Sequence, residues 1–155
     1  DLAADFGARA VFPFEGPPYH PFQRWARRAE PVHESPLGML IHPDYGLWHA
    51  YRGALALPAV LDLPAPDHRR PPCERCRERP CLRACPVGAF TGTGYRVDAC
   101  TGFLASPGGQ RCDAGCLARH ACPVGRPFAY APAHAGYLMR AFRRARGRPR
   151  PGDGA

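Results

Sequence analysis

Short blocks of hydrophobic and polar residues alternate along the first part of the chain and predict a few small elements. Residues 22–29 place aromatic side chains on one side and arginines on the other at helical spacing, so we predict an amphipathic helix there. The short apolar run at residues 9–14 is typical of a strand, with Pro13 at its edge or end. Residues 1–8 read as the end of a helix, with Gly7 as its predicted stop.

Two further apolar runs, residues 35–42 and 47–57, flank a Pro-Asp-Tyr-Gly sequence at residues 43–46. Both runs are rich in residues that favour strands, and Pro-Asp-x-Gly is typical of a tight turn. The pattern therefore predicts an antiparallel hairpin around this turn. We interpret His42 and His49 within it as hydrogen-bonded sheet residues rather than metal ligands.

The pattern changes after residue 57. Five prolines within residues 58–72 predict a semi-rigid connector without regular structure. Single helical turns are predicted at residues 82–84 and 117–121, with a short strand or turn at residues 95–99.

The last part of the chain predicts one longer helix, at residues 133–146, with arginines gathered at its C-terminal end, where they suit the helix dipole. Its predicted apolar stripe consists of Tyr137, Leu138, Ala141 and Phe142. The Gly/Pro-rich residues 147–155 predict a disordered tail.

All eight cysteines lie between residues 73 and 122, and their spacing forms two runs of four. The runs are Cys73-x2-Cys76-x4-Cys81-x3-Cys85-Pro86 and Cys100-x11-Cys112-x3-Cys116-x5-Cys122-Pro123. Each run ends inside the pentapeptide Ala-Cys-Pro-Val-Gly. A duplicated four-cysteine motif that closes on Cys-Pro is typical of ferredoxins with two [4Fe–4S] clusters. The proline lacks an N–H group and fixes φ, so it ends the ligand loop at a turn.

In two-cluster ferredoxins the fourth cysteine of a run binds the other cluster. That rule divides the cysteines into two sets, and both sets are predicted metal ligands. The first cysteine set is Cys73, Cys76, Cys81 and Cys122, and the second cysteine set is Cys85, Cys100, Cys112 and Cys116. The predicted cofactors are two [4Fe–4S] clusters.

Two other uses of eight cysteines are open. A disulfide framework suits a small secreted domain, but no signal peptide is visible and the thiols crowd into a third of the chain. A structural zinc site normally uses two separated Cys-x2-Cys knuckles, and only Cys73-x2-Cys76 has that spacing. Zinc chemistry also gives no reason for a proline after the last ligand of both runs. A zinc-stabilised interaction module is therefore an alternative that the spacing favours less than the iron–sulfur interpretation.

All 21 basic residues behind the formal net charge of +8 are arginines, since the chain contains no lysine. The arginine excess accompanies an Ala-, Pro- and Gly-rich composition that GC-rich genomes produce. Two bound clusters would lower the net charge to about +4. Basic residues can steer an acidic partner, but we expect no nucleic-acid partner. No apolar run has the length of a membrane span, and cluster thiolates need a reducing compartment, so we expect a cytoplasmic protein.

The order of these motifs resembles the iron–sulfur half of the epoxyqueuosine reductases, a family related to the reductive dehalogenases. The resemblance covers residues 40–48, with the pattern His-Pro-x-Tyr-Gly-x-Trp, and residues 73–123, with the order of the cysteines. It implies that two [4Fe–4S] clusters pass electrons to a cobalamin held by a preceding domain. The chain differs from the family where Ser35-Pro36-Leu37-Gly38 replaces a Gly-Lys-Asn stretch, and the family's long C-terminal extension is absent from it.

Together the patterns predict an α+β fold in four segments. These are a small N-terminal α/β segment with a hairpin at residues 1–57, a Pro-rich linker at 58–72, a loop-rich two-cluster ferredoxin-like module at 73–130, and a C-terminal basic helix with a disordered tail at 131–155. Because residues 1–6 read like the middle of a helix, we expect the first segment to be a truncated domain.

The predicted function is single-electron transfer. We predict no catalytic residues in the chain and expect an electron carrier rather than an enzyme by itself. The alternative is the electron-input half of a cobalamin-dependent reductase. Four arginines lie among the ligands of the first run: Arg75, Arg77, Arg79 and Arg83. We expect a redox partner, such as an acidic flavoprotein, to dock over them.

Overall fold

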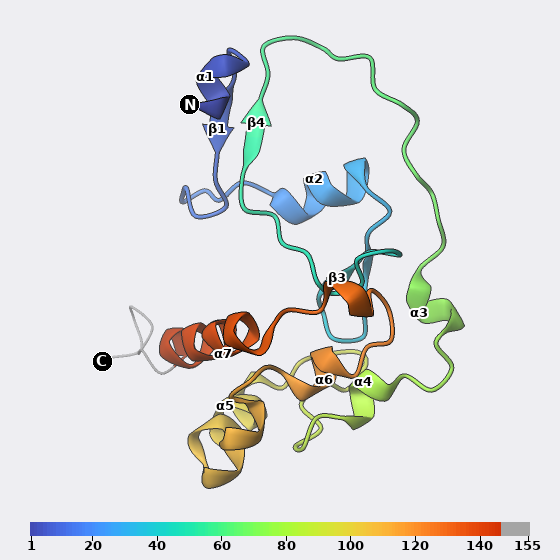
Figure 1. Cartoon of the computed structure of the whole chain (residues 1–155), viewed down its shortest axis with the longest axis vertical. Coiled ribbons are helices and arrows are strands. Elements are labelled where there is room, and N and C mark those ends of the chain that lie inside the picture. The colour runs from blue at the N-terminus through green and yellow to red at the C-terminus, as the bar shows by residue number, and fades with distance from the viewer. Residues whose placement is uncertain (147–155) are drawn as a thin grey trace.

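The computed structural model describes residues 1–146, which form short helices and two small antiparallel sheets. The predicted α+β class is therefore confirmed at this level. Figure 1 shows the N-terminal sheet at one end of the molecule, the cysteine-rich helices at the other, and a long connector that joins them along one side. Among these residues, no helix has both the length and the apolar character that a bilayer crossing requires.

The N-terminal sheet pairs strand β1 (Arg9–Val11) with β4 (Ala54–Ala56) in antiparallel register. Helix α1 (Leu2–Asp5) precedes it and begins at Asp1, whose carboxylate accepts a hydrogen bond from the Ala3 N–H at 3.1 Å. The predicted helix stop is also present, since Gly7 has a φ of +57°, a conformation that glycine adopts without strain.

Helix α2 (Phe22–Ala29) has the bounds that its amphipathic pattern predicts. Phe22 and Ala26 are buried, whereas Trp25, the third residue of the predicted face, is 39% exposed. Trp25 tilts against Phe22, with ring centroids 5.1 Å apart, and so covers the edge of the buried face.

The predicted hairpin around residues 43–46 is wrong in its pairing. The turn itself forms, because the backbones of His42 and Gly46 exchange two hydrogen bonds of 2.9 Å. Beyond the turn, however, residues 47–57 leave in another direction. Strand β3 (Leu40–Ile41) pairs backwards with β2 (His33–Glu34), and β4 pairs with β1 instead.

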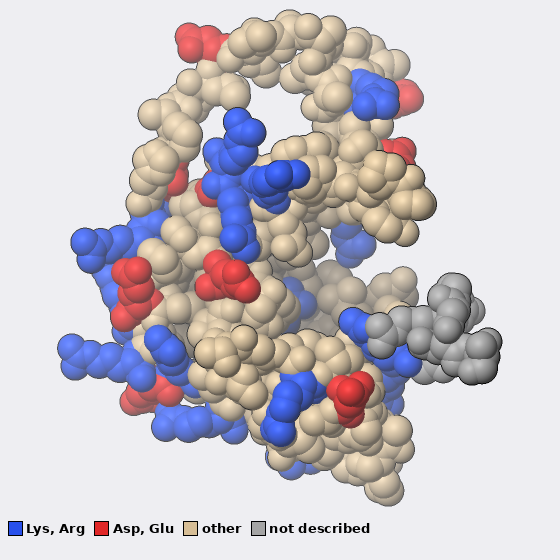
Figure 2. Space-filling view, turned by 180° about the vertical axis from the view of Figure 1, so that it is seen from behind, with Lys and Arg blue, Asp and Glu red and all other residues tan. Residues whose placement is uncertain are grey.

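The connector over residues 57–71 contains no helix or strand. In Figure 2 it stands away from the rest of the molecule and encloses an opening. Near its C-terminal end Arg69 donates two hydrogen bonds, of 2.7 and 2.8 Å, to the Asp44 carboxylate and one of 2.6 Å to Asp67. This clasp ties the connector to the turn at residues 43–46.

The cysteine-rich region is a chain of short helices joined by tight turns. They are α3 (Pro72–Arg75), α4 (Pro80–Arg83), α5 (Val97–Ala105), η1 (Pro107–Cys112), α6 (Leu117–His120) and η2 (Arg126–Phe128). Helices α4 and α6 confirm the two predicted helical turns. The predicted strand or turn at residues 95–99 is mostly the start of α5, which carries Cys100 inside a helix.

Helix α7 (Pro132–Arg146) confirms the predicted C-terminal helix, but not all of its apolar stripe. Tyr137 is 60% exposed, and the residues buried on this helix are Ala135 and Gly136. A Cβ at Gly136 would lie 2.7 Å from the Asp113 carbonyl oxygen, so a small residue is needed where the helix meets the end of η1. The predicted disordered tail, residues 147–155, lies outside the described residues.

The largest group of buried side chains joins residues from both sides of the connector. Its members are Leu37, Ile41, Leu47, Ala118 and Cys122. The backbones also approach closely here, because a Cβ on Gly46 would clash with the Val124 carbonyl, and one on Gly125 would clash with Tyr45. The turn at residues 43–46 is therefore part of the packing of the cysteine-rich region.

Candidate metal centre

All eight cysteines are free thiols, so the structure contains no disulfide among them. Cys112 and Cys122 are buried, and the other six are partly buried. Thiols of intermediate burial in a small module leave the sulfur atoms reachable by a cofactor while their Cβ atoms pack against the core.

The thiols of the first cysteine set influence one another's pKa, although Cys122 lies far from the others in sequence. Burial, and then the charges of Cys122, Cys81 and Cys76, raise the pKa of Cys73 to about 11. Burial followed by the charges of Cys122 and Cys76 raises the pKa of Cys81 in the same way. The pKa of Cys122 is raised by burial and by Cys76. Each thiol therefore lies close enough to other members of its set to interact with their charges.

The second cysteine set shows the same pattern. Burial raises the pKa of Cys112, with contributions from Cys100 and Cys85. Burial also raises the pKa of Cys116, with contributions from Cys112 and Cys100. For all five thiols with a resolved shift, the cysteine neighbours that raise the pKa belong to the thiol's own set.

Peptide N–H groups interact with several of these sulfurs and favour the thiolate form. The Ala89 N–H donates to Cys85 Sγ at 3.3 Å. The N–H groups of Ala118 and Arg119, in the first turn of α6, lower the pKa of Cys116 against the larger effect of burial. Amide donors of this kind are a main means by which proteins stabilise cluster thiolates.

The turn at residues 43–46 and the residues beside it cover the first cysteine set. Leu47 and Ile41 pack with Cys122 in the core, and its edge is packed by Cys73 and Cys81 of the first set as well as by Cys85 and Cys116 of the second. An arginine fastens this cover in place: Arg119 donates to the Leu47 carbonyl, and its guanidinium lies 4.9 Å from the Trp48 ring.

Sequence patterns did not reveal the role of Arg119, which also lies 4.6 Å from the ring of Tyr130. The available signal was its position between two cysteines of different sets, Cys116 and Cys122. A guanidinium held between two aromatic faces keeps a fixed orientation, so it can link α6 to the residues before the connector.

The histidines at the turn behave as polar structural residues. His42 is buried, and its Nδ1 accepts hydrogen bonds from the Asp44 and Tyr45 N–H groups at 3.0 and 3.3 Å. That agrees with the interpretation of His42 as a hydrogen-bonded residue. His49 differs, since its Nδ1 is buried without a hydrogen-bond partner among the described residues.

The predicted docking arginines, Arg75, Arg77, Arg79 and Arg83, are all exposed. Figure 2 shows cationic side chains on both halves of this face of the molecule, several of them along one edge of the half that holds the cysteine-rich helices, with acidic residues among them. Arg79 lies near enough to the first cysteine set for its charge to lower the pKa of Cys73, although burial dominates that shift. Arg79 also has a φ of +42°, which is unusual for a residue with a side chain.

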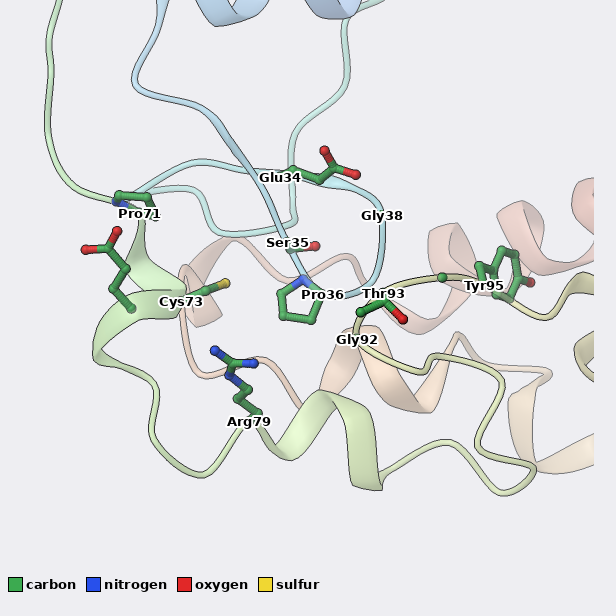
Figure 3. A pocket seen from close by; sticks show the side chains of 12 residues that line it. Glu34, Ser35, Pro36, Gly38, Pro71, Cys73, Arg79, Gly92, Thr93 and Tyr95 are labelled. Atoms are coloured by element: carbon green, nitrogen blue, oxygen red, sulfur yellow. The ribbon is translucent and has the colours of Figure 1, made fainter.

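A groove of about 670 Å³ opens beside the first cysteine set. Figure 3 shows Cys73 and Arg79 on one side of the groove and Tyr95 at the other end. Its walls are formed by Glu34, Ser35, Pro36, Gly38, Pro71, Cys73, Glu74, Arg79, Gly92, Thr93, Gly94 and Tyr95. The groove therefore runs from the first cysteine set to the residues that precede Cys100.

The donor set fits iron–sulfur clusters in its chemistry, because it offers eight thiols in two sets of four. Within residues 1–146 no three His, Cys, Asp or Glu side chains are grouped so that they could hold a metal ion. A single zinc ion would draw its four thiolates to within about 4 Å of one another. A cluster binds each thiolate through a different iron atom, so its ligands surround a volume rather than a point.

Comparisons of the chain with protein-family models, with curated proteins and with solved structures found no match. The resemblance to the epoxyqueuosine reductases therefore stays a prediction that depends on the cysteine order and the His-Pro-x-Tyr-Gly-x-Trp pattern alone.

Proposed function

We propose that this protein transfers single electrons and binds two [4Fe–4S] clusters, one on each cysteine set. The observation that carries the proposal is the division of the thiols. The sulfurs that interact through their charges are those that the crossed ligation of the duplicated motif assigns to one set. Cys122, which closes the second run in sequence and yet interacts through its charge with Cys73 and Cys81 of the first run, is the strongest single case.

Other features of the site support the same function. The thiols are free, amide N–H groups interact with their sulfurs, and apolar side chains cover one side. A bound cluster would supply a centre that gains and loses one electron. The chain itself would hold the thiolates, exclude water around Cys122 and Cys112, and set the potential through its hydrogen bonds.

The test is anaerobic purification followed by iron and acid-labile sulfide analysis. We expect a brown protein with about eight iron and eight sulfide per chain, and EPR signals of reduced [4Fe–4S] clusters after dithionite treatment. Stoichiometric zinc without sulfide would contradict the proposal and favour the zinc-stabilised module. A variant with all eight cysteines changed to serine is the control for adventitious iron.

The raised pKa values of the thiols add a second readout. Because burial raises the pKa of Cys73, Cys112 and Cys116, these groups are protonated near pH 7 in the free protein. Binding of metal as thiolate must then release protons. We expect reconstitution in weakly buffered solution to release more protons with wild type than with the cysteine-free variant under the same additions of iron and sulfide.

We further propose that an acidic redox partner docks over the exposed arginines of the first run. The positions of these arginines support the proposal. Arg79 lines the groove beside Cys73, and Arg75 and Arg77 lie close to Cys73 and Cys76 in the chain. Complementary charges raise the rate of encounter more than the affinity, and salt screens them.

The docking test reverses charge away from the groove. In the double variant Arg75→Glu/Arg77→Glu, reduction by a partner such as an acidic flavoprotein should slow at low salt, while iron content stays normal. The matched control, Arg24→Glu/Arg28→Glu on α2, makes the same charge change at exposed positions outside the cysteine-rich region. Equal rates for wild type and the Arg75/Arg77 variant would rule out this docking face.

A further inference from the structure

Exposed aliphatic and phenyl side chains are concentrated at one end of the molecule. Among residues 1–146, ten leucine, valine and phenylalanine side chains are exposed, and nine of them lie in residues 2–14 and 55–63. Figure 1 shows α1, β1, β4 and the first part of the connector together, at the end away from the cysteine-rich helices. The nine side chains form what we call the apolar end: Leu2, Phe6, Phe12, Phe14, Leu55, Leu57, Val60, Leu61 and Leu63.

The two segments of the apolar end are joined by direct contacts. Strands β1 and β4 pair with Ala10 opposite Leu55, and α1 contacts β1. Phe12 stacks on Phe14, with ring centroids 5.3 Å apart. A Cβ on Gly53, the residue before β4, would lie 3.4 Å from the Phe12 ring. The two segments therefore belong to one surface.

The apolar end is large enough to form one side of a stable interface. Taking about 200 Å² for a fully exposed large apolar side chain, its nine members expose on the order of 1,000 Å². A monomer rarely leaves more than a few hundred Å² in one apolar patch, and a standard protein interface covers about 800 Å² on each partner. The other exposed large apolar side chains, apart from Phe128, are tyrosines and a tryptophan, which carry a polar group that water can solvate.

The backbone at the apolar end is also available for pairing. Strands β1 and β4 form a two-stranded sheet, so each has one unpaired edge. Within residues 1–146 no backbone hydrogen bond involves residues 58–66. The N–H and C=O groups of residues 59–63 are therefore free beside the exposed side chains of Val60, Leu61 and Leu63. A two-stranded ribbon is only marginally stable without further packing, so this part of the fold gains from being covered.

The distribution of charge indicates what covers this surface. Residues 10–14 contain no charged residue, and residues 53–66 contain one, Asp62. Of the 21 arginines, Arg9 alone lies within residues 1–14 and 53–66, so the rest of the chain carries the positive charge. Within the part of the chain that the structure describes, the surface of a second copy that matches the apolar end is therefore the apolar end itself. A contact between identical surfaces closes about a two-fold axis.

We propose that two copies of this chain associate through their apolar ends about a two-fold axis. The contact removes the nine side chains from water and orders residues 59–63 of each connector against the other copy. The cysteine-rich helices lie at the far end of each copy (Figure 1), so the arginines of the first run stay exposed in the dimer. The inference does not depend on which metal the cysteines bind.

Sedimentation equilibrium of the full chain over a range of concentrations measures the association. We expect twice the mass of one chain at high concentration and dissociation on dilution. Val60→Glu should raise the dissociation constant at least about tenfold, because the interface would bury a charge without a partner. Val60 is fully exposed, so this change leaves the fold of the single copy intact. The matched control is Tyr137→Glu, which adds the same charge at an exposed position on α7 and should associate as wild type does.

A second variant tests the other segment of the apolar end. Phe14→Ala should also weaken the association, because Phe14 is 74% exposed in the single copy and would be buried in the dimer. Hydrogen exchange gives a further measurement. The amides of residues 59–63 should exchange more slowly as the concentration of wild type rises, and Val60→Glu should remove this dependence.

Each other outcome overturns the inference in its own way. A monomer at every concentration would show that nothing of this chain covers the apolar end. A dimer that both Val60→Glu and Phe14→Ala leave unchanged would place the interface elsewhere, and a mass that grows beyond two copies would contradict the two-fold closure. A different protein bound in equal amount would mean that another partner occupies this surface. Iron and sulfide analysis of the same samples tests the proposed function separately, so the two failures are distinguishable.

Discussion

The two cysteine sets are held by different parts of the molecule. Ile41 and Leu47, before the connector, form the core that holds Cys122 of the first set, and the turn at residues 43–46 meets Val124 close to Cys122; Cys85 and Cys116 of the second set touch only the edge of this core. The second set depends more on the C-terminal elements: α5 packs on η1, and Arg143 of α7 forms a 2.7 Å ion pair with Asp113 next to Cys112. A local change should therefore affect the two sets unequally, and that inequality is open to experiment.

The largest effect is expected from removing the ligand that crosses between the runs. Cys122→Ser should lose the first cluster and keep the second, so that about four iron per chain remain. The loss should also destabilise the chain, since so small a module has little core without its metal. Iron analysis and EPR measure the outcome.

Second substitutions identify the surviving cluster. In the Cys122→Ser background, Cys76→Ser should change nothing further, whereas Cys100→Ser should remove the remaining iron. The reverse result would show that Cys122 serves the second set and that the crossed ligation is wrong.

A smaller effect is expected at the close approach between the turn and the second Cys-Pro sequence. Gly46→Ala should lower the free energy of unfolding by about 3 kcal/mol, from left-handed strain and from the clash with the Val124 carbonyl. Gly38→Ala is the matched control, because Gly38 also has a positive φ but a Cβ there meets nothing within 4 Å, so about 1 kcal/mol is expected. Urea denaturation compares the two.

A second measurement on the Gly46→Ala variant is which cysteine set loses its iron first. A chelator should take iron from the first set before the second, since the turn covers the first set. Equal costs for Gly46→Ala and Gly38→Ala would mean that the turn does not press on Val124.

The second set is tested more gently by Arg143→Ala. This substitution removes the ion pair with Asp113 and a 3.0 Å hydrogen bond to the Gly109 carbonyl. Because the pair is partly exposed, we expect a cost of about 1 kcal/mol and a faster chelation of iron from the second set. Arg144→Ala, at the next position and exposed, should change neither quantity. An equal effect of the two substitutions would contradict the assignment of α7 to the second set.

The smallest effect is expected at the clasp between the connector and the turn, in Arg69→Gln. The Arg69 side chain is the largest cause that lowers the pKa of Asp44; for Asp67 the largest cause is the Arg69 backbone N–H, which Arg69→Gln keeps, and the side chain contributes less. The charged carboxylates therefore stabilise the fold, mainly through Asp44 where the side chain is concerned. A carboxyl group whose pKa is lowered in the folded protein stabilises the fold at pH values above its ordinary pKa. This stabilisation is lost as the pH falls through the lowered pKa.

The pH and salt dependence of unfolding measure this clasp. Wild type should be slightly more stable than Arg69→Gln at pH 7, and the two should converge as the pH falls below about 4 or as the salt concentration rises. A difference that persists in acid and in high salt would mean that Arg69 acts through packing rather than charge.

Elements whose signal is local were predictable from the sequence. Helix α2 has the predicted bounds because its buried residues repeat at helical spacing, and α4 and α6 are explained by the few residues between closely spaced cysteines. The predicted hairpin was wrong in its pairing because alternating apolar and polar residues identify a strand but not the strand with which it pairs. The sequence around residues 43–46 specifies a turn, and β4 then pairs with β1, which lies far earlier in the chain.

The candidate site divides in the same way. The assignment of the eight cysteines to two sets is a prediction from motif spacing, whereas the contacts of Arg119 depend on tertiary packing. The buried glycine of α7, Gly136, was missed because close backbone approach leaves no hydrophobic signal.

The close approach of Gly46 to Val124 has a consequence for how the chain can be divided. The pieces before and after the connector share one core, so the covalent link over residues 57–71 serves mainly to raise their local concentration. A chain cut by protease within that exposed link should migrate as a single particle under native conditions and as two bands under denaturing ones. Two separately expressed pieces, residues 1–57 and 72–155, should likewise complement each other.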